Sequence, residues 1–400
     1  MNVLIIGASV AGIRTAEALR RHGFDGTVTL LGEEPHPPYD KPPLSKDVLA
    51  MDGTGEPPPL LSADETEALA LDLRLGVRAV ALEPRARVVT TDAGVRLGFD
   101  RLVIATGVTP RTLPGAGSLD GVYTLRTADD ALALRGELDR AARVVVIGAG
   151  FIGAEFASAA RTRGLDVSVV EVQDTPMAHL LGARVGGMLA GLHEAHGVAV
   201  HTGVGFERFE DDGNARVSGV VLTDGRVLPA DLVVVGIGAR PATEWLESSG
   251  LPVENGVVCD VNLRVPGTSG IYAAGDVALR HHPLYGAPLR IEHWTNAGEH
   301  GETVAADILG MPVPPAQVPY VWSDQYGRRI QIVGRPATGE ARVLHGGIDA
   351  PSLVAVYADR AGTAVGALVV DDPRTLMRCR RAVAAGTSLE GLDLGLAAKL

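Results

Sequence analysis

The stretch RVVVIGAGFIGAEFASAARTRG, residues 143–164, decides the fold class of this chain. It predicts an apolar strand, a glycine-rich turn and a helix. Gly148, Gly150 and Gly153 have the spacing of a dinucleotide-binding turn, which needs a tight bend, a close approach of backbone N–H groups to a pyrophosphate and close packing of helix on strand. The strand that follows ends at Glu171, near the position of an acid that hydrogen-bonds a ribose 2′-hydroxyl.

The N-terminal segment repeats this arrangement. An apolar strand precedes GASVAG, residues 7–12, and a helical pattern and a second strand that ends in Glu33 follow it. The middle position of this turn is Ser9, which is small enough to be tolerated although it departs from the glycine pattern. Two such turns in one chain predict two bound dinucleotides.

The second pattern interrupts the domain that the first pattern opens. RLVIATG, residues 101–107, predicts a strand of the first domain, whereas the next strand and turn, GIYAAGDV, come only at residues 270–277. We therefore predict an α/β protein with two doubly wound dinucleotide-binding domains, the second inserted in the first, and a C-terminal α+β domain of antiparallel strands and one helix. The predicted boundaries are 1–108 and 241–320 for the first domain, 109–240 for the second and 321–400 for the third.

Composition and charge narrow the function classes. The 400 residues are 46% hydrophobic, and apolar runs such as Leu232–Ala239 are too short to cross a membrane, so we expect a cytoplasmic protein of two or three domains. Cys259 and Cys379 lie far apart in sequence and form no redox pair, and we assign no metal site. The net charge of −12 argues against nucleic-acid binding, although residues 321–400 carry ten Lys and Arg against eight Asp and Glu.

Three further segments point to one family. They are YDKPPLSK at residues 39–46, RIEHWTNA at 290–297 and VWSDQYG at 321–327. With these segments and the glycine-rich turns, the whole chain resembles the FAD-containing, NADH-dependent ferredoxin reductases that supply bacterial cytochrome P-450 enzymes and Rieske-type oxygenases, which have a glutathione-reductase-like fold. The resemblance implies FAD in the first domain, NADH in the second and a 2Fe–2S or other iron–sulfur ferredoxin as electron acceptor.

The same resemblance assigns a catalytic pair. In the family, the lysine of PPLSK lies at the redox-active edge of the flavin and pairs with the glutamate that follows the second glycine-rich turn. Here these residues are Lys46 and Glu155, which we expect to come from the two different nucleotide domains. Pro42 and Pro43 restrict the loop, so that less entropy is lost in holding it against a planar ring. The alternative is an ordinary surface lysine.

Other cofactor contacts also follow from the resemblance. Glu33 would hold the adenosine ribose of FAD, Asp276 would lie by the ribityl chain and Trp294 would pack at the flavin; the alternatives are solvated turn carboxylates and a core tryptophan. The expected FAD contacts are Gly7, Ser9, Ala11, Gly12, Glu33, Lys46, Val80, Ala105, Thr106, Gly107, Arg126, Gly275, Asp276 and Trp294. The expected NAD contacts are Gly148, Gly150, Phe151, Ile152, Gly153, Glu155, Glu171 and Gly238.

Charge decides the choice between NADH and NADPH. A 2′-phosphate about 4 Å from Glu171 would cost roughly 4 kcal/mol per charge pair at an effective dielectric constant of about 20. We therefore expect NADH. His179 stands where relatives often have an arginine that steadies the nucleotide, so we expect weaker NADH binding.

The reaction implied by the resemblance is electron transfer from NADH through FAD to a ferredoxin, with the chain supplying mainly positioning. Two alternatives stay open: an NADH-dependent reductase of a small molecule or of oxygen on the same scaffold, and a redox-signalling flavoprotein of the apoptosis-inducing-factor type. We expect a monomer or a weak homodimer. An acidic ferredoxin would need a local basic patch, for which the candidates are Arg290, Arg328, Arg329, Arg378, Arg380 and Arg381.

Overall fold

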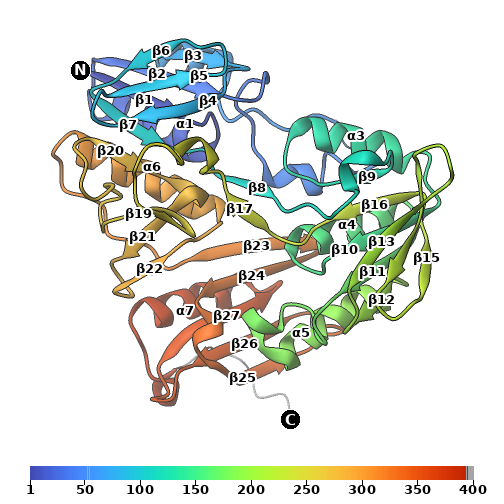
Figure 1. Ribbon diagram of the computed structural model, residues 1–400. Coiled ribbons are helices and arrows are strands. Elements are labelled where there is room, and N and C mark those ends of the chain that lie inside the picture. The colour runs from blue at the N-terminus through green and yellow to red at the C-terminus, as the bar shows by residue number, and fades with distance from the viewer. Residues whose placement is uncertain (52, 54, 393, 395–400) are drawn as a thin grey trace. The chain divides into compact units, whose positions relative to one another are not determined.

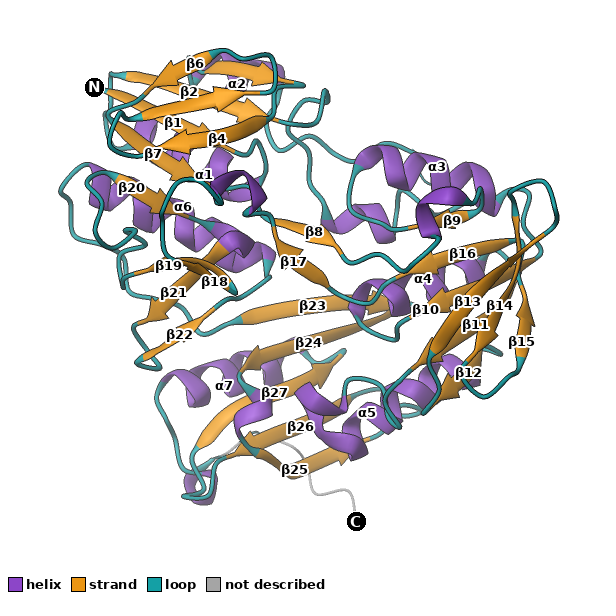
Figure 2. Ribbon diagram, in the orientation of Figure 1, coloured by secondary structure: helices purple, strands orange, loops and turns teal. Residues whose placement is uncertain are grey.

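Two parallel β-sheets of five strands carry the two glycine-rich turns (Figures 1 and 2). The computed structural model describes residues 1–51, 53, 55–392 and 394. The predicted α/β class with two doubly wound sheets is confirmed. The chain divides into two units, of which the first comprises Met1–Asp40, Pro58–Thr109 and Ala239–Pro319, and the second Lys41–Pro57, Pro110–Gly238 and Tyr320–Leu400.

The parallel sheet of the first unit has the strand order β20-β7-β1-β2-β3. From the central strand β1 the chain runs to one side through β2 and β3 and then to the other side through β7 and β20, which creates a switch point between β1 and β7. Ligands of doubly wound sheets bind at the carboxyl ends of the strands at such a point. The elements are β1 (Asn2–Ile6), α1 (Val10–Arg21), β2 (Thr27–Gly32), β3 (Asp72–Leu75), β7 (Arg101–Ile104), β20 (Ile271–Ala273) and α6 (Trp294–Ile308).

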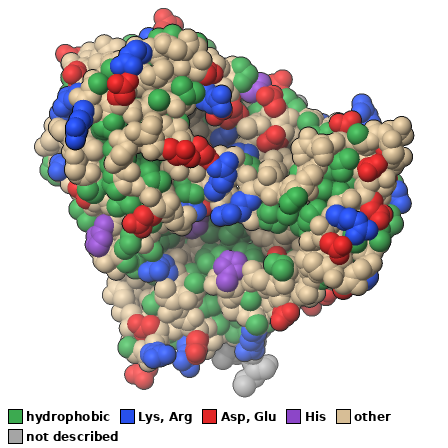
Figure 3. Space-filling view, in the orientation of Figure 1, with side chains coloured by type: hydrophobic (Ala, Val, Ile, Leu, Met, Phe, Trp, Pro, Cys, Tyr) green, Lys and Arg blue, Asp and Glu red, His purple; other side chains and the backbone are tan. Residues whose placement is uncertain are grey.

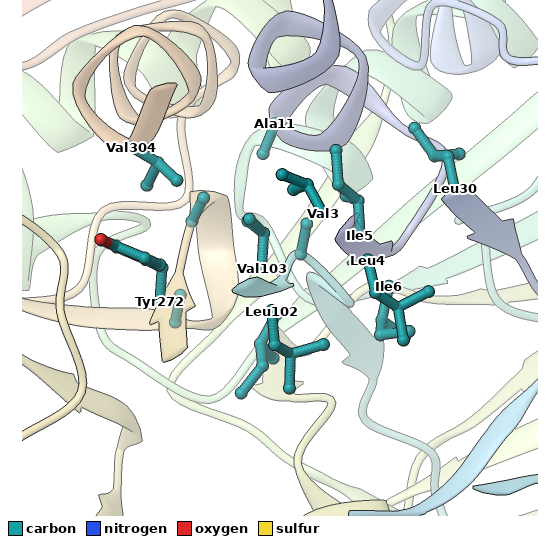
Figure 4. Packing of buried hydrophobic residues seen from close by; sticks show 14 of the residues in the cluster. Val3, Leu4, Ile5, Ile6, Ala11, Leu30, Leu102, Val103, Tyr272 and Val304 are labelled. Atoms are coloured by element: carbon teal, nitrogen blue, oxygen red, sulfur yellow. The ribbon is translucent and has the colours of Figure 1, made fainter. Parts of the chain in front are cut away.

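A buried apolar layer joins this sheet to its helices (Figure 4). Val3 of β1, Val103 of β7 and Val304 of α6 are fully buried, and the strands read as continuous Val, Ile and Leu runs, as strands covered on both faces require. Helices α1 and α6 pack closely because Gly301 has no side chain. A Cβ there would lie 2.7 Å from the backbone nitrogen of Thr15.

Smaller elements complete the first unit. The antiparallel sheet β4-β5-β6 follows β3, the sheet β18-β19-β21-β22 precedes α6, and the short pair β8 and β17 lies where the chain leaves this unit and returns to it. Their bounds are α2 (Ala63–Ala68), β4 (Ala79–Glu83), β5 (Val88–Thr91), β6 (Arg96–Gly98), β8 (Val108–Pro110), β17 (Ala239–Pro241), η3 (Glu244–Leu246), β18 (Val253–Glu254), β19 (Gly256–Cys259), η4 (Gly275–Val277), β21 (Ala278–His282) and β22 (Ala287–Leu289).

The parallel sheet of the second unit has the order β12-β11-β10-β16-β9, with its switch point between β10 and β16. An antiparallel sheet, β13-β14-β15, accompanies it. The elements are η1 (Pro42–Ser45), η2 (Ala116–Ser118), β9 (Val122–Tyr123), α3 (Ala128–Leu138), β10 (Arg143–Ile147), α4 (Phe151–Thr162), β11 (Asp166–Glu171), α5 (Ala178–Ala195), β12 (Ala199–Thr202), β13 (Phe206–Asp211), β14 (Val217–Leu222), β15 (Val227–Pro229) and β16 (Leu232–Val235).

The C-terminal segment forms the antiparallel sheet β23-β24-β27-β26-β25, and the antiparallel strands and helix predicted for it are confirmed. Helix α5 packs its apolar side on one face of this sheet and α7 covers the other, so the segment shares a core with the rest of the second unit. Tyr357, for example, donates a hydrogen bond to the carbonyl oxygen of Leu181 at 2.8 Å. The elements are β23 (Tyr320–Gln325), β24 (Arg328–Gly334), η5 (Pro336–Thr338), β25 (Glu340–Gly346), β26 (Leu353–Ala358), β27 (Ala364–Val370), α7 (Pro373–Ala384) and η6 (Leu389–Gly391).

The loop Lys41–Pro57 belongs to the second unit, although the sequence on both sides of it lies in the first. Arg135 of α3 donates to backbone carbonyl oxygens of this loop, among them that of Val48 at 2.7 Å. Arg163, which ends α4, donates to the carbonyl oxygen of Leu49 at 2.8 Å. Two guanidinium groups therefore anchor the loop on helices of the second unit.

Candidate functional site

The first glycine-rich turn is shaped by the chain's own backbone. A Cβ atom on Gly7 would lie 2.1 Å from the carbonyl oxygen of Ala105 at the end of β7, and one on Gly12 would lie 2.0 Å from that of Gly7. Gly7 also has φ +123°, so both positions require glycine. Ser9 has extended backbone (φ −112°, ψ −165°) just before α1. The departure at Ser9 is therefore compatible with the fold.

The second turn repeats this geometry. A Cβ on Gly148 would lie 2.4 Å from the carbonyl oxygen of Gly236, and one on Gly153 would lie 2.0 Å from that of Gly148. Around Gly150, such an atom would meet nothing within 4 Å beyond the adjoining residues in the described part of the chain. Packing of the chain does not require the middle glycine, so this position at the N-terminus of α4 has room for a ligand.

The two strand-end acids have different environments. Glu171 is buried, and its carboxylate oxygens accept hydrogen bonds from the backbone N–H groups of Ala149 (3.0 Å) and Gln173 (2.9 Å). Its carboxylate therefore lies directly beside the second turn. Glu33 is exposed, with 71% of its side chain accessible, and lies 3.9 Å from Arg78.

The turn at Gly275 lies beside the first glycine-rich turn. A Cβ on Gly275 would lie 3.0 Å from that of Ala11 in α1. The N–H of Gly275 donates to Nδ1 of His300 at 3.1 Å, and burial, with a further effect of Arg280, lowers the pKa of His300 well below its usual value. His300 is therefore neutral and can accept this bond, which holds the turn that carries half-buried Asp276.

The segment that follows β7 ends at the same edge of the sheet. The N–H of Ala105 donates to the carbonyl oxygen of Ile6, and Oγ1 of Thr106 donates to that of Ala242, both at 2.8 Å. Gly107 follows with φ +68°. The structure thus gathers several predicted FAD contacts of the first unit around one switch point: Gly7, Ala11, Gly12, Ala105 and Gly275.

Three predicted FAD contacts are held differently. Trp294 is the first residue of α6, and its Nε1 donates to Oδ1 of Asp40 at 2.7 Å. Val80 lies on β4 and is 39% exposed. Arg126 belongs to the second unit, and its backbone N–H donates to Asp130 at 2.9 Å. A role at the flavin stays a prediction for each of the three.

The remaining predicted NAD contacts lie near the second turn or its sheet. Phe151 and Ile152 open α4, and Ile152 is 44% exposed. Gly238 has φ +92° after β16. His179, in the first turn of α5, lies with Nδ1 3.2 Å from the side-chain amide of Gln173, the residue whose N–H binds the strand-end acid.

Lys46 and Glu155 form a shielded ion pair. Nζ of Lys46 lies 2.8 Å from Oε2 of Glu155, and only 16% and 3% of the two side chains are accessible. Ser45 donates its hydroxyl proton to the same oxygen. Both members of the pair lie in the second unit, although the sequence on either side of the loop Lys41–Pro57 lies in the first. The reason is the anchoring of the loop Lys41–Pro57 on α3 and α4.

Sequence reasoning missed the residues that surround Glu155. Its other oxygen, Oε1, accepts hydrogen bonds from Oγ of Ser323 (2.7 Å) and from the N–H of Asp324 (3.2 Å). Ser45 and Ser323 lie within YDKPPLSK and VWSDQYG. The available signal was therefore a hydroxyl residue inside each of two segments already singled out.

A second missed group holds the β23–β24 hairpin on α4 and α5. The N–H of Tyr326 donates to Oγ of Ser158 at 2.7 Å, its hydroxyl lies 2.7 Å from Nδ1 of His193, and His196 stacks on its ring. Burial, with a smaller effect of His196, lowers the pKa of His193 to about 4, whereas burial raises that of Tyr326. At neutral pH both are uncharged, so the tyrosine donates to the histidine.

The six arginines proposed for docking differ in their contacts. The guanidinium carbon of Arg329, an exposed residue, lies 5.6 Å from the ring centre of Trp322, and that of Arg380 lies 5.9 Å from Tyr320. The others are Arg290 and Arg328, which are in ion pairs with nearby acids, and Arg378 and Arg381, which are exposed on α7.

Neither cysteine is suited to redox chemistry. Cys259 and Cys379 are buried, and burial raises their thiol pKa to about 12 and about 11. Among the described residues, no three His, Cys, Asp or Glu side chains are arranged to hold a metal ion. No helix in this part of the chain is long and apolar enough to cross a membrane.

Comparisons with known proteins agree with this site. The model of the pyridine nucleotide-disulphide oxidoreductases matches residues 1–301, and the reductase C-terminal model matches residues 320–395. Rhodocoxin reductase of Rhodococcus erythropolis is 37% identical, over 96% of this chain and 90% of the relative. The ferredoxin–NAD(+) reductase component of the p-cumate 2,3-dioxygenase system of Pseudomonas putida is 36% identical, over 97% and 94%.

A solved structure extends the agreement to the fold. The crystal structure of the covalent putidaredoxin reductase–putidaredoxin complex contains a chain that superposes with a TM-score of 0.92 at 32% identity, over 96% of this chain and 93% of that one. The resemblance noted in the sequence is confirmed, and the chain belongs to the pyridine nucleotide-disulphide oxidoreductase family, with a reductase C-terminal domain.

Proposed function

We propose that this protein is an FAD-dependent NADH:ferredoxin oxidoreductase that serves a cytochrome P-450 or Rieske-type oxygenase. The observation that carries the proposal is the match along nearly the whole chain, C-terminal domain included, to proteins named as reductases of such systems. The shielded Lys46–Glu155 pair and the burial of both cysteines favour electron transfer over thiol chemistry.

FAD fits the first unit. The turn at residues 7–12 places the N–H groups that begin α1 at the switch point of the sheet, where a pyrophosphate is favoured. Glu33 would bind the adenosine ribose, and Asp276 the ribityl chain. Bound FAD supplies the redox chemistry, because a flavin accepts two electrons together and releases them singly.

NADH fits the second unit. The open position at Gly150 leaves room for a pyrophosphate at the N-terminus of α4, and Glu171 beside the turn would accept a hydrogen bond from a ribose 2′-hydroxyl. The same carboxylate repels the 2′-phosphate of NADPH. Phe151 and Ile152 would line the path of the nucleotide.

Lys46 would present a positive charge to the flavin, and Glu155 would hold that charge in place. In a shielded environment an ammonium group needs a partner, and the carboxylate at 2.8 Å provides it. A fixed cation next to an electron acceptor favours its reduced form. Neither residue needs to act as a nucleophile.

The ferredoxin would dock on a basic surface of the C-terminal domain. On the face seen in Figure 3, Lys and Arg side chains are scattered among Asp and Glu side chains. Residues 321–400 have two more basic than acidic residues, while the whole chain has a net charge of −12. Arg329 and Arg380, each over an aromatic ring, are the docking residues we propose first. A cytoplasmic location and a monomer or weak homodimer complete the proposal.

The test is NADH-driven reduction of a panel of purified ferredoxins, with dye reduction as a reference. We expect one ferredoxin to be reduced with saturation kinetics, and Arg329→Glu to raise its KM while dye reduction is unchanged. Equal activity with every acceptor would favour the small-molecule reductase. The same conclusion would follow if the protein consumed oxygen at a rate that added ferredoxin did not lower. A yellow protein that NADH reduces but that turns over no acceptor would favour the signalling flavoprotein.

A further inference from the structure

Strand β23 contacts Glu155 on the side opposite Lys46. Oε2 of this carboxylate binds Lys46 and Ser45, whereas Oε1 binds Ser323 Oγ at 2.7 Å and the N–H of Asp324 at 3.2 Å. The two oxygens thus face two segments of the second unit, the loop Lys41–Pro57 and the first strand of the C-terminal domain.

The direction of the Ser323 hydrogen bond is determined by its second neighbour. Nε2 of Gln325 donates to Oγ of Ser323 at 3.0 Å, which occupies an acceptor position of the hydroxyl. An ionised carboxylate can only accept, so the single hydroxyl proton points to Glu155. The result is a chain of donors from Gln325 through Ser323 to Glu155.

Ser323 and Gln325 are polar residues at buried positions, where polar groups lower the stability of the fold unless they are hydrogen-bonded. Ser323 is 0% and Gln325 2% exposed, and Oε1 of Gln325 has no hydrogen-bond partner in the described part of the chain. A buried unpaired carbonyl costs stability, and an apolar residue would avoid that cost. Alternate residues of a strand face opposite sides, so β23 places Ser323 and Gln325 on the side of Glu155 and Trp322 on the other side, where it meets Arg329.

We propose that Ser323, oriented by Gln325, is a positioning residue for the Lys46–Glu155 pair. It holds the glutamate rotamer in which Oε2 faces the loop, and thereby fixes the place of the Lys46 ammonium. This inference rests on the proposed function, in which that ammonium faces the flavin. It goes further, because it gives the first strand of the C-terminal domain a part in positioning the positive charge near the cofactor. The same strand carries Trp322.

The first test is chemical and needs no turnover. The chain has only three lysines, Lys41, Lys46 and Lys399, so the acylation of each lysine can be followed separately by mass spectrometry of peptides. In the FAD-loaded protein, we expect Ser323→Ala to speed acylation of Lys46 relative to Lys41 by about tenfold, the effect of losing one hydrogen bond to a charged group. Ser118→Ala, which removes an exposed hydroxyl bound to Gly115, is the matched control and should change nothing.

The second test measures the flavin. We expect Ser323→Ala to make its midpoint potential more negative and to lower kcat for NADH-driven dye reduction, with KM for NADH unchanged because the second glycine-rich turn is intact. Ser323→Cys leaves no cavity, because a thiol is slightly larger than a hydroxyl, but it is only a weak donor. It should therefore behave like Ser323→Ala with a melting temperature closer to that of the wild type. Gln325→Leu should shift all three readouts in the same direction by less.

Three outcomes separate the inference from the function on which it rests. The inference alone would be overturned by the following result: Ser323→Ala and Ser323→Cys change neither the acylation of Lys46 nor the flavin midpoint potential, whereas Lys46→Met and Glu155→Gln are strongly impaired. Normal NADH oxidation and potential in Lys46→Met would overturn the proposed role of the pair. A lowered melting temperature in all Ser323 and Gln325 variants with unchanged Lys46 acylation would assign the residues to folding only, against the proposal.

Discussion

The two glycine-rich turns of this chain have the same backbone and different middle residues. In both, the outer glycines are required by carbonyl oxygens 2.0–2.4 Å from the place of a Cβ. The middle positions, Ser9 and Gly150, carry no such constraint. The fold therefore requires the outer glycines, whereas the space at the middle position is open to the ligand that we propose.

The acids that follow the two turns differ in burial and in hydrogen bonding. Glu171 is buried and tied by backbone N–H groups to the second turn, whereas Glu33 is exposed near the first. In the function that we propose, the carboxylate of Glu171 is therefore already held in place before a nucleotide binds. In the same proposal, the exposed side chain of Glu33 would take up its position only when FAD binds. Four predictions test this contrast.

The largest effect should come from an outer glycine. Gly12→Ala or Gly153→Ala would place a Cβ 2.0 Å from a backbone carbonyl oxygen whose position is fixed by the turn. We therefore expect each variant to lose at least about 4 kcal/mol in stability. The measurement is soluble yield and thermal unfolding of each variant. A folded, ligand-binding Gly153→Ala protein would contradict the distinction between outer and middle positions.

The second largest effect should be a loss of stability at low pH, because each unit contains a buried neutral histidine. The pKa of His193 is lowered from 6.5 to about 4, so its contribution to stability is complete above pH 6.5 and is lost as the pH falls toward 4. At pH 5 the loss is about 2 kcal/mol. Urea unfolding of His193→Gln at pH 7 and pH 5 should show a smaller decline than the wild type.

The control for this experiment is the other unit. His300 binds Gly275 next to the first turn, and its lowered pKa predicts acid loss in the same direction. His193→Gln should leave the release of FAD at low pH unchanged. An equal acid decline in wild type and His193→Gln would show that His193 is not the group that titrates.

Cofactor preference should change by a smaller factor. Glu171→Gln combined with His179→Arg removes the negative charge beside the turn and adds a positive one, so kcat/KM for NADPH should rise at least about tenfold relative to NADH. Glu33→Gln, which changes the strand-end acid of the first unit, is the matched control. A change of preference in the control, or none in the double variant, would refute the role of Glu171.

The smallest effect should come from making the turns alike. Gly150→Ser copies the residue of the first turn, and serine is a good residue before a helix, so we expect stability within about 0.5 kcal/mol of the wild type. KM for NADH should rise about fivefold, because a side chain now occupies the space for the pyrophosphate. An unchanged KM would show that the space at Gly150 is not used.

Much of the fold was predictable from short patterns. The strand, turn and helix around Gly148 lie within 22 residues, and their geometry depends on neighbouring backbone atoms. The antiparallel C-terminal strands and helix α7 follow from alternation and from Pro373. The pairing of Lys46 with Glu155 came from the resemblance, since nothing local links residues so far apart.

The amino-acid sequence by itself indicated the two glycine-rich turns, the acids that follow them and the two doubly wound sheets, because these features leave a short glycine spacing and runs of buried apolar residues in the sequence. Only the tertiary structure decided that Lys46 belongs to the unit of Glu155 and that Ser323 binds the same carboxylate. Those contacts join residues 109 and 168 positions apart. They are made by one ammonium group, one carboxylate and one hydroxyl, which leave no periodic trace in a sequence and meet only when the chain has folded.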